Sequence, residues 1–388
     1  NKQMNTDNTT TKAAKSQRVL SVDILRGLTI AGMILVNNPG GPEEDSFAPL
    51  NHADWLGLTP TDLVFPSFMF IMGITTYLSL RKFNFSWSKE CARKIAKRAF
   101  LLWGIGLAIA LVLTMIRGAL HPENWNGFGY MFAHLRLLGV LPRLGICYGL
   151  VAVVAISVRH KFIPWLIAFI FVAYYILLEL CNGYAHDGSN ILAVVDNIVL
   201  GADHVYRWDT PDPEGLLSTL PALGHVLIGF CVGKVIMNLN DLNDKIERLF
   251  VIGTTLILAG VLLSYACPIS KKLWTPTFAM TTCGIASTLL ALMTWVIDKK
   301  HKQGRLTEFF HVFGVNPLAL YVFSDILLIP FCMLPIFGGK TLQDFCFEDV
   351  LSSFLPLPLA SLVWACFFVA CCWIVGLWLY KKKIYIKL

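Results

Sequence analysis

The sequence predicts an all-α, polytopic membrane protein with about ten transmembrane helices. Hydrophobic residues make up 56% of the 388-residue chain and charged residues only 15%, whereas soluble domains carry about 25% charged residues. The mean hydropathy is +0.62, and apolar runs recur along the whole chain. The net charge of +7 comes from basic residues in short loops, which indicates a lipid bilayer and not a nucleic acid as the partner.

Ten apolar runs are long enough to cross a hydrocarbon core of about 30 Å. They lie at 19–38, 61–80, 99–116, 138–158, 162–181, 216–238, 249–267, 276–297, 309–330 and 356–380. We expect residues 1–18, which are polar, to form a disordered cytoplasmic tail. Residues 19–388 then form a single transmembrane domain.

Basic residues are distributed unevenly between the two sides of these runs. Most of the 32 Lys and Arg residues fall in the N-terminal tail, in every second connection and in the C-terminal segment. Cytoplasmic loops carry such an excess of Lys and Arg. We therefore expect both termini in the cytoplasm, and the connection after the first run on the opposite side.

That connection ends in a polar stretch, residues 51–66 (NHADWLGLTPTDLVFP), at the mouth of the second run. Thr59, Pro60 and Asp62 suit the N-cap, first and third positions of a helix. Trp55 is typical of an anchor at the membrane interface. His52 has no such structural role, although a histidine in an external loop is usually only solvated. Its imidazole can accept a proton near neutral pH, and Asn37 at the end of the first run is expected nearby.

Charged residues inside the spans allow structural and functional interpretations. Asp23 and Arg26 have the spacing of a pair on one helix, and Arg26 can instead meet an anionic ligand. Arg136 and Arg143 bracket the start of the fourth run, where ligand contact and structural pairing are equally open. Asp325 lies either near the outer boundary or in a cavity.

Other polar residues have more definite structural expectations. His225 is expected to form a hydrogen bond with a neighbouring helix, and Asn316, which precedes a proline, marks a kink in the ninth run. Asp212 and Glu214 before the sixth run suit helix capping as well as sugar binding.

The cysteines indicate no metal centre. The chain has 11 cysteines, mostly within apolar runs, and their spacing does not match that of zinc or iron–sulfur ligands. Cys332 and Cys346 share one predicted external loop, so a disulfide between them is an open alternative.

Together these segments resemble the heparan-α-glucosaminide N-acetyltransferase family of membrane acyltransferases. The matching segments are SVDILRG at 21–27, VNNPGG at 36–41, the stretch from His52 to Pro66 continuing to FIMG at 70–73, GVLPRLG at 139–145, DPEG at 212–215, KLW at 272–274 and NPLALYV at 316–322.

The resemblance implies an acetyltransferase that takes acetyl from acetyl-CoA on the cytoplasmic side and delivers it to an amine of glucosamine on the other side. The family's active-site histidine falls on His52, a functional asparagine on Asn37, and an arginine on Arg143. The lysosomal member has a large luminal N-terminal domain, which we expect this chain to lack. We therefore expect a bacterial-type enzyme in the inner membrane, with His52 facing the periplasm.

The resulting hypothesis assigns roles to further residues. Asp54, Asp62, Asp212 and Glu214 are the candidates for binding an amino sugar or glycan acceptor, whereas Arg26, Arg143 and Asn316 are the candidates for binding CoA. Acetyl passes either directly to the acceptor or through an acetyl-histidine. O-acetylation, a homodimer and an amino-sugar transporter without acyl transfer remain alternatives.

Overall fold

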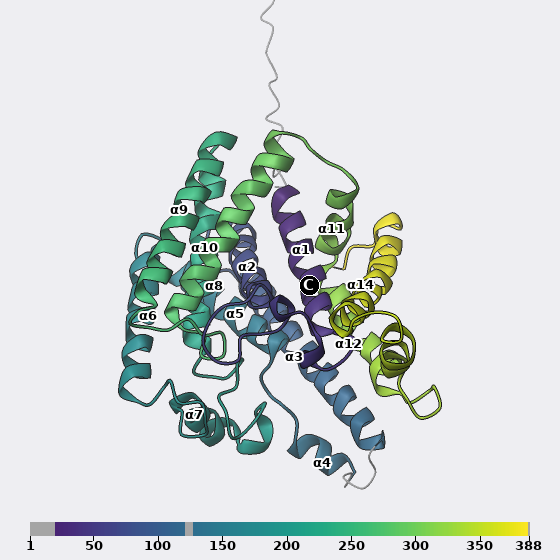
Figure 1. Ribbon diagram of the computed structural model, residues 1–388. Helices are drawn as coiled ribbons and strands as arrows, with labels where there is room; N and C mark the ends of the chain where they lie inside the picture. The colour runs from purple at the N-terminus through teal and green to yellow at the C-terminus, as the bar shows by residue number, and fades with distance from the viewer. Residues whose placement is uncertain (1–19, 121–126, 387–388) are drawn as a thin grey trace, which may run out of the picture.

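The computed structural model describes residues 20–120 and 127–386, and over these ranges the chain is a bundle of α-helices without a β-strand (Figure 1). This confirms the predicted all-α membrane fold. The tail predicted at residues 1–18 lies outside the described residues.

The helices follow one another along the chain with short connections. They are α1 Leu20–Asn37, α2 Val64–Arg81, α3 Lys89–Leu120, α4 Phe128–Ala133, α5 Val140–Ser157, α6 Ile163–Leu180, α7 Ile191–Leu200, α8 Thr219–Asn238, α9 Leu242–Leu263, α10 Pro276–Met293, α11 Arg305–Val315, α12 Pro317–Leu328, α13 Leu342–Asp344 and α14 Leu357–Lys381. π-helical turns extend α10 to Lys299, α12 to Met333 and α13 to Leu351.

Within the described residues, nine helices are long and apolar enough to cross a bilayer, and one bent pair brings the number to ten. The bent pair is α11 with α12, which meet at an angle of 84°. The predicted kink at Asn316 is therefore observed. Its amide forms hydrogen bonds with the C-terminal segment, donating to the Ile384 carbonyl (2.8 Å) and accepting from the Ile386 N–H (2.9 Å).

Two helices differ in extent from the apolar runs. α3 begins about one-third of its length before the run predicted at 99–116, and α9 begins before the run predicted at 249–267. Hydropathy marks the part of a helix that suits lipid, whereas backbone hydrogen bonding continues through Lys, Arg and Glu, which are good helix formers. The charged N-terminal turns of both helices therefore extend beyond the apolar run.

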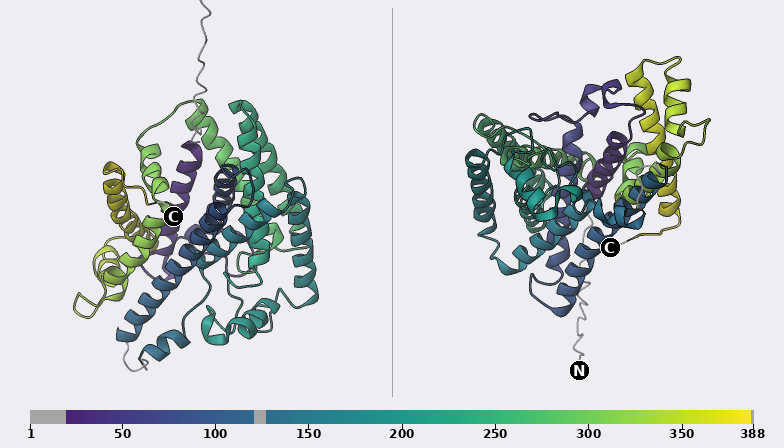
Figure 2. Two further views of the ribbon diagram at one scale, coloured as in Figure 1. Left: turned by 180° about the vertical axis from the view of Figure 1, so that it is seen from behind. Right: turned by 90° about the horizontal axis from the view of Figure 1, so that it is seen from below.

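The bundle has two groups of helices with α1 and α2 between them. Figure 1 shows α6, α8, α9 and α10 on one side and α11, α12 and α14 on the other, and Figure 2 shows the long α3 running obliquely across the back. α9 packs on α10, α2 on α8, α3 on α5 and α1 on α11. One continuous apolar core joins these pairs.

Glycines bring α2 and α8 into close contact. A Cβ atom at Gly73 would lie 2.2 Å from the Val226 carbonyl oxygen, and one at Gly229 would lie 2.1 Å from that of Phe70. Small residues of this kind let helix backbones approach each other in membrane proteins. The crossing positions α2, which directly follows the turn that carries the candidate site residue Asp62. His225 on α8 strengthens it, because its Nε2 lies 2.9 Å from the Pro66 carbonyl oxygen, as expected from the sequence.

Candidate active site

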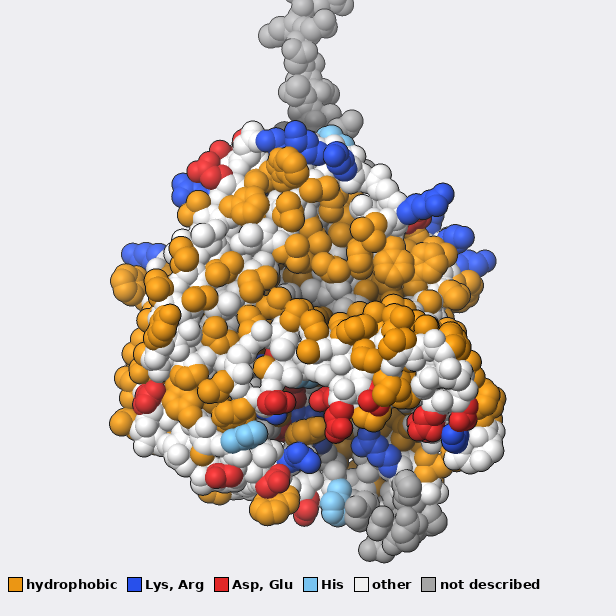
Figure 3. Space-filling model, viewed as in Figure 1, with side chains coloured by type: hydrophobic (Ala, Val, Ile, Leu, Met, Phe, Trp, Pro, Cys, Tyr) orange, Lys and Arg blue, Asp and Glu red, His pale blue; other side chains and the backbone are white. Residues whose placement is uncertain are grey.

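The connection between α1 and α2, residues 38–63, crosses one end of the bundle. Lys and Arg side chains gather at the other end, which we call the basic end. Its first part is attached to the C-terminal helices: the Gly40 N–H donates to Ser361 Oγ (3.0 Å), and Gln343 Nε2 donates to the Pro39 carbonyl (2.6 Å). Space-filling shows acidic, basic and histidine side chains gathered around a hollow in this lower half, whereas Lys and Arg dominate the top (Figure 3).

The second part of this connection is attached to the other helix group. The Gly57 N–H donates to the Ile269 carbonyl and Ser270 Oγ donates to that of Trp55, both at 2.7 Å. Trp55 Nε1 donates to the Tyr184 carbonyl, and its ring stacks on His186 at 4.2 Å. Trp55 thus joins two loops, and its role as an interface anchor stays a prediction.

His52 and Asp62 form a hydrogen-bonded pair. His52 Nδ1 lies 2.7 Å from Asp62 Oδ1, and the two side chains are 39% and 0% exposed. A carboxylate that accepts from Nδ1–H fixes the imidazole tautomer and leaves Nε2 as the basic nitrogen. The pair therefore presents a proton acceptor to the hollow while its carboxylate stays inside the protein.

Backbone and side-chain donors hold Asp62 in place. Its Oδ2 accepts from the N–H groups of Ala53 (3.1 Å) and Thr59 (3.2 Å) and from Thr59 Oγ1 (3.1 Å). Asp62 thus accepts from the Thr59 N–H near the helix start, as the predicted capping arrangement requires. The prediction of Thr59 as N-cap and Pro60 as first residue is wrong, because the helix begins with a 3₁₀ turn at Thr61–Leu63 whose N-cap is Pro60, and the Thr59 hydroxyl donates to Asp62. One carboxylate orients the imidazole and also shapes the loop that carries it.

Lys271 completes this cluster. Its Nζ lies 3.0 Å from His52 Nδ1, 3.3 Å from His52 Nε2 and 3.5 Å from Asp62 Oδ1. Burial lowers the pKa of Lys271 below its ordinary value, and the carboxylates of Asp62 and Glu214 oppose this shift. The cluster therefore contains a desolvated cation beside a base.

The turn between α9 and α10 places Lys271 there. Trp274 has φ +50° and is fully buried, with its ring packed edge-on against Phe65 and Phe278. Tyr174 Oη donates to the Leu273 carbonyl at 2.7 Å. The buried Trp274 indole and the hydrogen bond from Tyr174 on α6 fix this turn. The turn therefore holds Lys271 in one position.

Asp212 and Glu214, predicted to bind the acceptor, are paired with Arg136. Arg136 Nε donates to Asp212 Oδ2 (3.1 Å) and Nη2 donates to Glu214 Oε2 (2.7 Å). The Asp212 side chain is 1% exposed and that of Glu214 12%. Burial alone would lower the pKa of Arg136, but Glu214 and Asp212 raise it above its ordinary value. Arg136 therefore stays charged and fixes the loop before α8.

Arg143 is fully buried and serves the same loop. Its guanidinium donates to the carbonyls of Pro213 (2.8 Å) and Gly215 (3.0 Å) and to Ser218 Oγ, and it lies 5.1 Å from the centre of the Trp274 ring. These contacts fit the structural interpretation of Arg143, and a ligand contact by Arg143 stays a prediction.

The other predicted site residues lie in different settings. Asn37 ends α1 and Asp54 lies in the connection that follows; both are exposed. Arg26 contacts Asp23 (2.6 Å) and the Gly314 carbonyl (2.9 Å), and the Asn316 amide contacts the C-terminal segment. Binding of CoA at Arg26, Arg143 or Asn316 would therefore require these groups to exchange partners.

The sequence did not single out Lys271. It lies 219 residues from His52 in the chain, so no local spacing connects them. One signal was present: Lys271 and Lys272 stand in a connection on the side where basic residues are rare. Cys332 and Cys346, the candidate disulfide, are both free thiols in the structure. In the described ranges, no group of three or more His, Cys, Asp or Glu side chains is arranged to hold a metal ion.

Residues 18–265 match the family described as heparan-alpha-glucosaminide N-acetyltransferase, catalytic. The chain belongs to this family. The matched range contains His52, Asp62 and Arg143, whereas Lys271 lies just beyond it.

Two relatives carry the name heparan-alpha-glucosaminide N-acetyltransferase. The mouse (Mus musculus) protein is 25% identical over 378 residues, covering 82% of this chain and 55% of its own length. The human (Homo sapiens) protein is 26% identical over 375 residues, covering 81% of this chain and 54% of its own length. The chain thus spans about half the length of the curated relatives it matches.

Proposed function

We propose that this protein is a transmembrane acetyltransferase that moves acetyl from acetyl-CoA in the cytoplasm to an amino sugar or glycan on the other side. The observation that carries the proposal is the partly exposed His52 imidazole, hydrogen-bonded to the fully buried Asp62 in a chain of this family. The gathering of Lys and Arg at the opposite end of the bundle (Figure 3) supports a cytoplasmic location for that end.

In a direct transfer, His52 Nε2 takes the proton from the acceptor amine as its nitrogen attacks the thioester carbonyl. The new C–N bond forms, the C–S bond breaks, and CoA leaves as the thiol or thiolate. In the alternative, the imidazole itself attacks and carries the acetyl group before the amine takes it. Both routes use Asp62 to hold the imidazole in one tautomer.

Negative charge develops on the carbonyl oxygen and the sulfur during either route. Lys271, whose Nζ lies 3.0–3.3 Å from the ring nitrogens, supplies a cation beside that charge. Asn37 is exposed at the end of α1, and we retain it as the candidate donor to the oxyanion. Removal of such a donor costs about 2.7–4 kcal/mol in a protease.

The proposal is tested by adding acetyl-CoA and glucosamine to the purified protein and measuring free thiol together with N-acetylglucosamine. We expect both products with wild type and neither with His52→Ala. His301→Ala is the matched control, because His301 is exposed in the α10–α11 connection at the basic end. Full turnover by His52→Ala removes His52 from the mechanism.

Two further measurements separate the remaining alternatives. Omitting the acceptor distinguishes the routes: stoichiometric CoA release with acetylated protein supports the acetyl-histidine, whereas a strict need for both substrates supports direct transfer. Uptake of glucosamine into vesicles without any CoA release would favour the transporter. Supplying acetyl-CoA to one face of sealed proteoliposomes tests the sidedness.

A further inference from the structure

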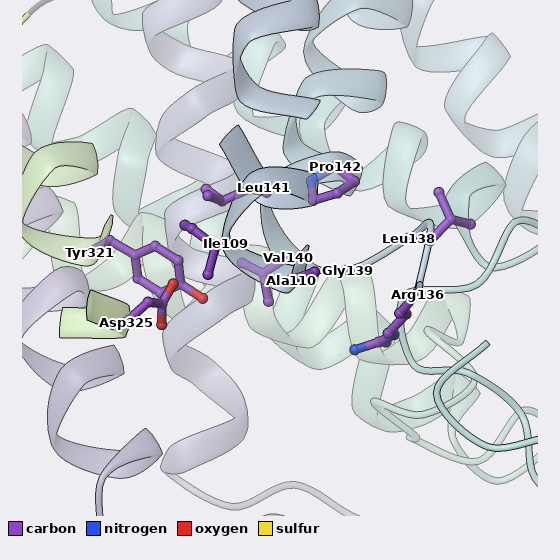
Figure 4. A pocket seen from close by; sticks show the side chains of 11 residues that line it. Ile109, Ala110, Arg136, Leu138, Gly139, Val140, Leu141, Pro142, Tyr321 and Asp325 are labelled. Carbon is purple, nitrogen blue, oxygen red and sulfur yellow. The ribbon is translucent and has the colours of Figure 1, made fainter. Parts of the chain in front are cut away.

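A cavity of about 200 Å³ lies between α3, the start of α5 and α12. Its residues do not include His52, Asp62 or Lys271. Figure 4 shows Tyr321 and Asp325 at one end of the cavity and Arg136 toward the other, with aliphatic side chains including Ile109 and Leu141 between them. The cavity is therefore apolar along its length and polar at both ends.

The carboxylate of Asp325 is the unexplained feature of this cavity. Asp325 and Tyr321 are four residues apart on α12, so they share one face of the helix. Within the described residues, Asp325 forms no hydrogen bond or ion pair, although it lies in a membrane-spanning segment. An unpaired carboxylate at such a place is costly and by default indicates a functional site.

At the end of the cavity opposite Asp325, Arg136 has hydrogen-bond donors without a partner among the described residues. The contacts of Arg136 with Asp212 and Glu214 use Nε and Nη2. Its Nη1 hydrogens have no hydrogen-bond partner among the described residues, and its side chain is 29% exposed. Asp212 and Glu214 carry two negative charges against the one positive charge of Arg136, and the Asp325 carboxylate adds a third, so the net charge around the cavity is negative. Such a cavity favours a cation that also carries oxygen acceptors, and it disfavours the phosphates of CoA.

We propose that this cavity recognises the acceptor as an amino sugar in its ammonium form. This inference rests on the proposed function and names a binding site for its acceptor. Asp325 pairs with the ammonium group, Tyr321 and Arg136 Nη1 bind hydroxyl oxygens, and the C–H faces of the sugar ring lie against Ile109 and Leu141. Binding here involves no covalent step. An ammonium group is not a nucleophile, so it gives one proton to solvent water when it leaves Asp325, and the neutral amine then reacts at His52.

The cavity is electrostatically connected to the His52 cluster. Glu214 forms a hydrogen bond with Arg136 at the cavity, and its charge also acts on Lys271, which contacts His52. Glu214 therefore links the recognition cavity and the proposed transfer site electrostatically.

The test measures equilibrium binding of glucosamine and of N-acetylglucosamine to the purified full chain without acetyl-CoA. N-acetylglucosamine has no ammonium group, so the ratio of the two affinities reports charge recognition. We expect Asp325→Asn to weaken glucosamine binding about 10- to 100-fold, as for a hydrogen bond to a charged group, and to leave N-acetylglucosamine binding unchanged. The control Asp209→Asn changes an exposed carboxylate in the α7–α8 connection and should keep the wild-type ratio.

Equal glucosamine binding by Asp325→Asn and wild type would overturn the proposal, as would an equal loss for both sugars. If Asp325→Asn does not fold, Ala110→Phe decides, because it fills the cavity without removing a polar group; undiminished glucosamine binding by this variant overturns the proposal. Failure of the enzyme function is distinguishable. If glucosamine binding depends on Asp325 but no CoA is released, the recognition cavity stands and the enzyme function fails. If Asp325→Asn releases CoA with a wild-type KM for glucosamine, the enzyme function stands and the recognition cavity is rejected.

Discussion

Replacing Asp62 by Asn should abolish most of the acetyl transfer. Asn keeps one oxygen, which can accept from the N–H groups of Ala53 and Thr59 as Asp62 Oδ2 does. Its NH₂ group then faces His52 Nδ1 and Lys271, which are donors in the wild type. The imidazole responds by adopting the other tautomer, with its proton on Nε2, so the basic lone pair no longer faces the acceptor.

The magnitude follows from the two groups lost. An Asp-to-Asn change that produces the wrong histidine tautomer lowers kcat about 10⁴-fold in a serine protease, and we expect a fall on the order of 10³- to 10⁴-fold here. The charge-assisted bond at 2.7 Å contributes about 1.5–3 kcal/mol to stability. The variant should therefore also unfold at a lower temperature.

Thiol release from acetyl-CoA measures kcat, and tryptophan fluorescence in detergent measures unfolding. Thr59→Ala is the matched control, since it removes one donor to Asp62 and leaves the pair with His52 intact; we expect kcat to fall by less than about tenfold. Residues that act as a unit are non-additive, so Asp62→Asn should cost little further activity in a His52→Ala background. A kcat within tenfold of wild type, or additive losses in the double variant, would refute the orienting role.

Lys271→Met should lower kcat more than it changes the KM for acetyl-CoA in steady-state assays, because the ammonium acts on charge that develops during transfer; a change confined to KM would contradict this. Gly73→Ala should lower the unfolding temperature, at a cost of about 1–3 kcal/mol, because the new Cβ meets the Val226 carbonyl at 2.2 Å; Gly104→Ala, with no atom near its new Cβ, should not. Burial raises the pKa of Asp196 to about 6, so its stabilising contribution is full below pH 4 and is lost as the pH rises through 6. Asp196→Asn should flatten this part of the stability profile, measured as unfolding temperature against pH, and an unchanged slope would exclude Asp196 as its source.

Features encoded locally in the sequence could be predicted. Among the residues that the structure describes, hydropathy located every helix long and apolar enough to span a bilayer, because each one satisfies its own backbone polar groups. Pro317 marked the break between α11 and α12. His52 and Asp62 lie ten residues apart, so one motif contained both. The helix start after Pro60 was also predicted, although Pro60 and not Thr59 is its N-cap.

Contacts between distant segments could not be predicted. Lys271 reaches His52 only because the α9–α10 turn is fixed by the buried Trp274 and by the loop around Trp55. Likewise, the contacts of Arg143 are with the segment 213–218, about 70 residues away in the chain. Tertiary packing determines which distant residues meet, and neither the periodicity nor the composition of the sequence predicts these contacts.

The connection that carries His52 is fastened to both groups of helices. Residues near Gly40 are bound to α14, whereas residues near Gly57 are bound to the α9–α10 turn. A small rotation of the group with α14 against the group with α9 and α10 would therefore stretch or relax this connection. We expect such a movement to change the separation between the His52 imidazole and Lys271. Binding events at the end of the bundle rich in Lys and Arg have in this way a mechanical route to the reactivity of a histidine at the opposite end.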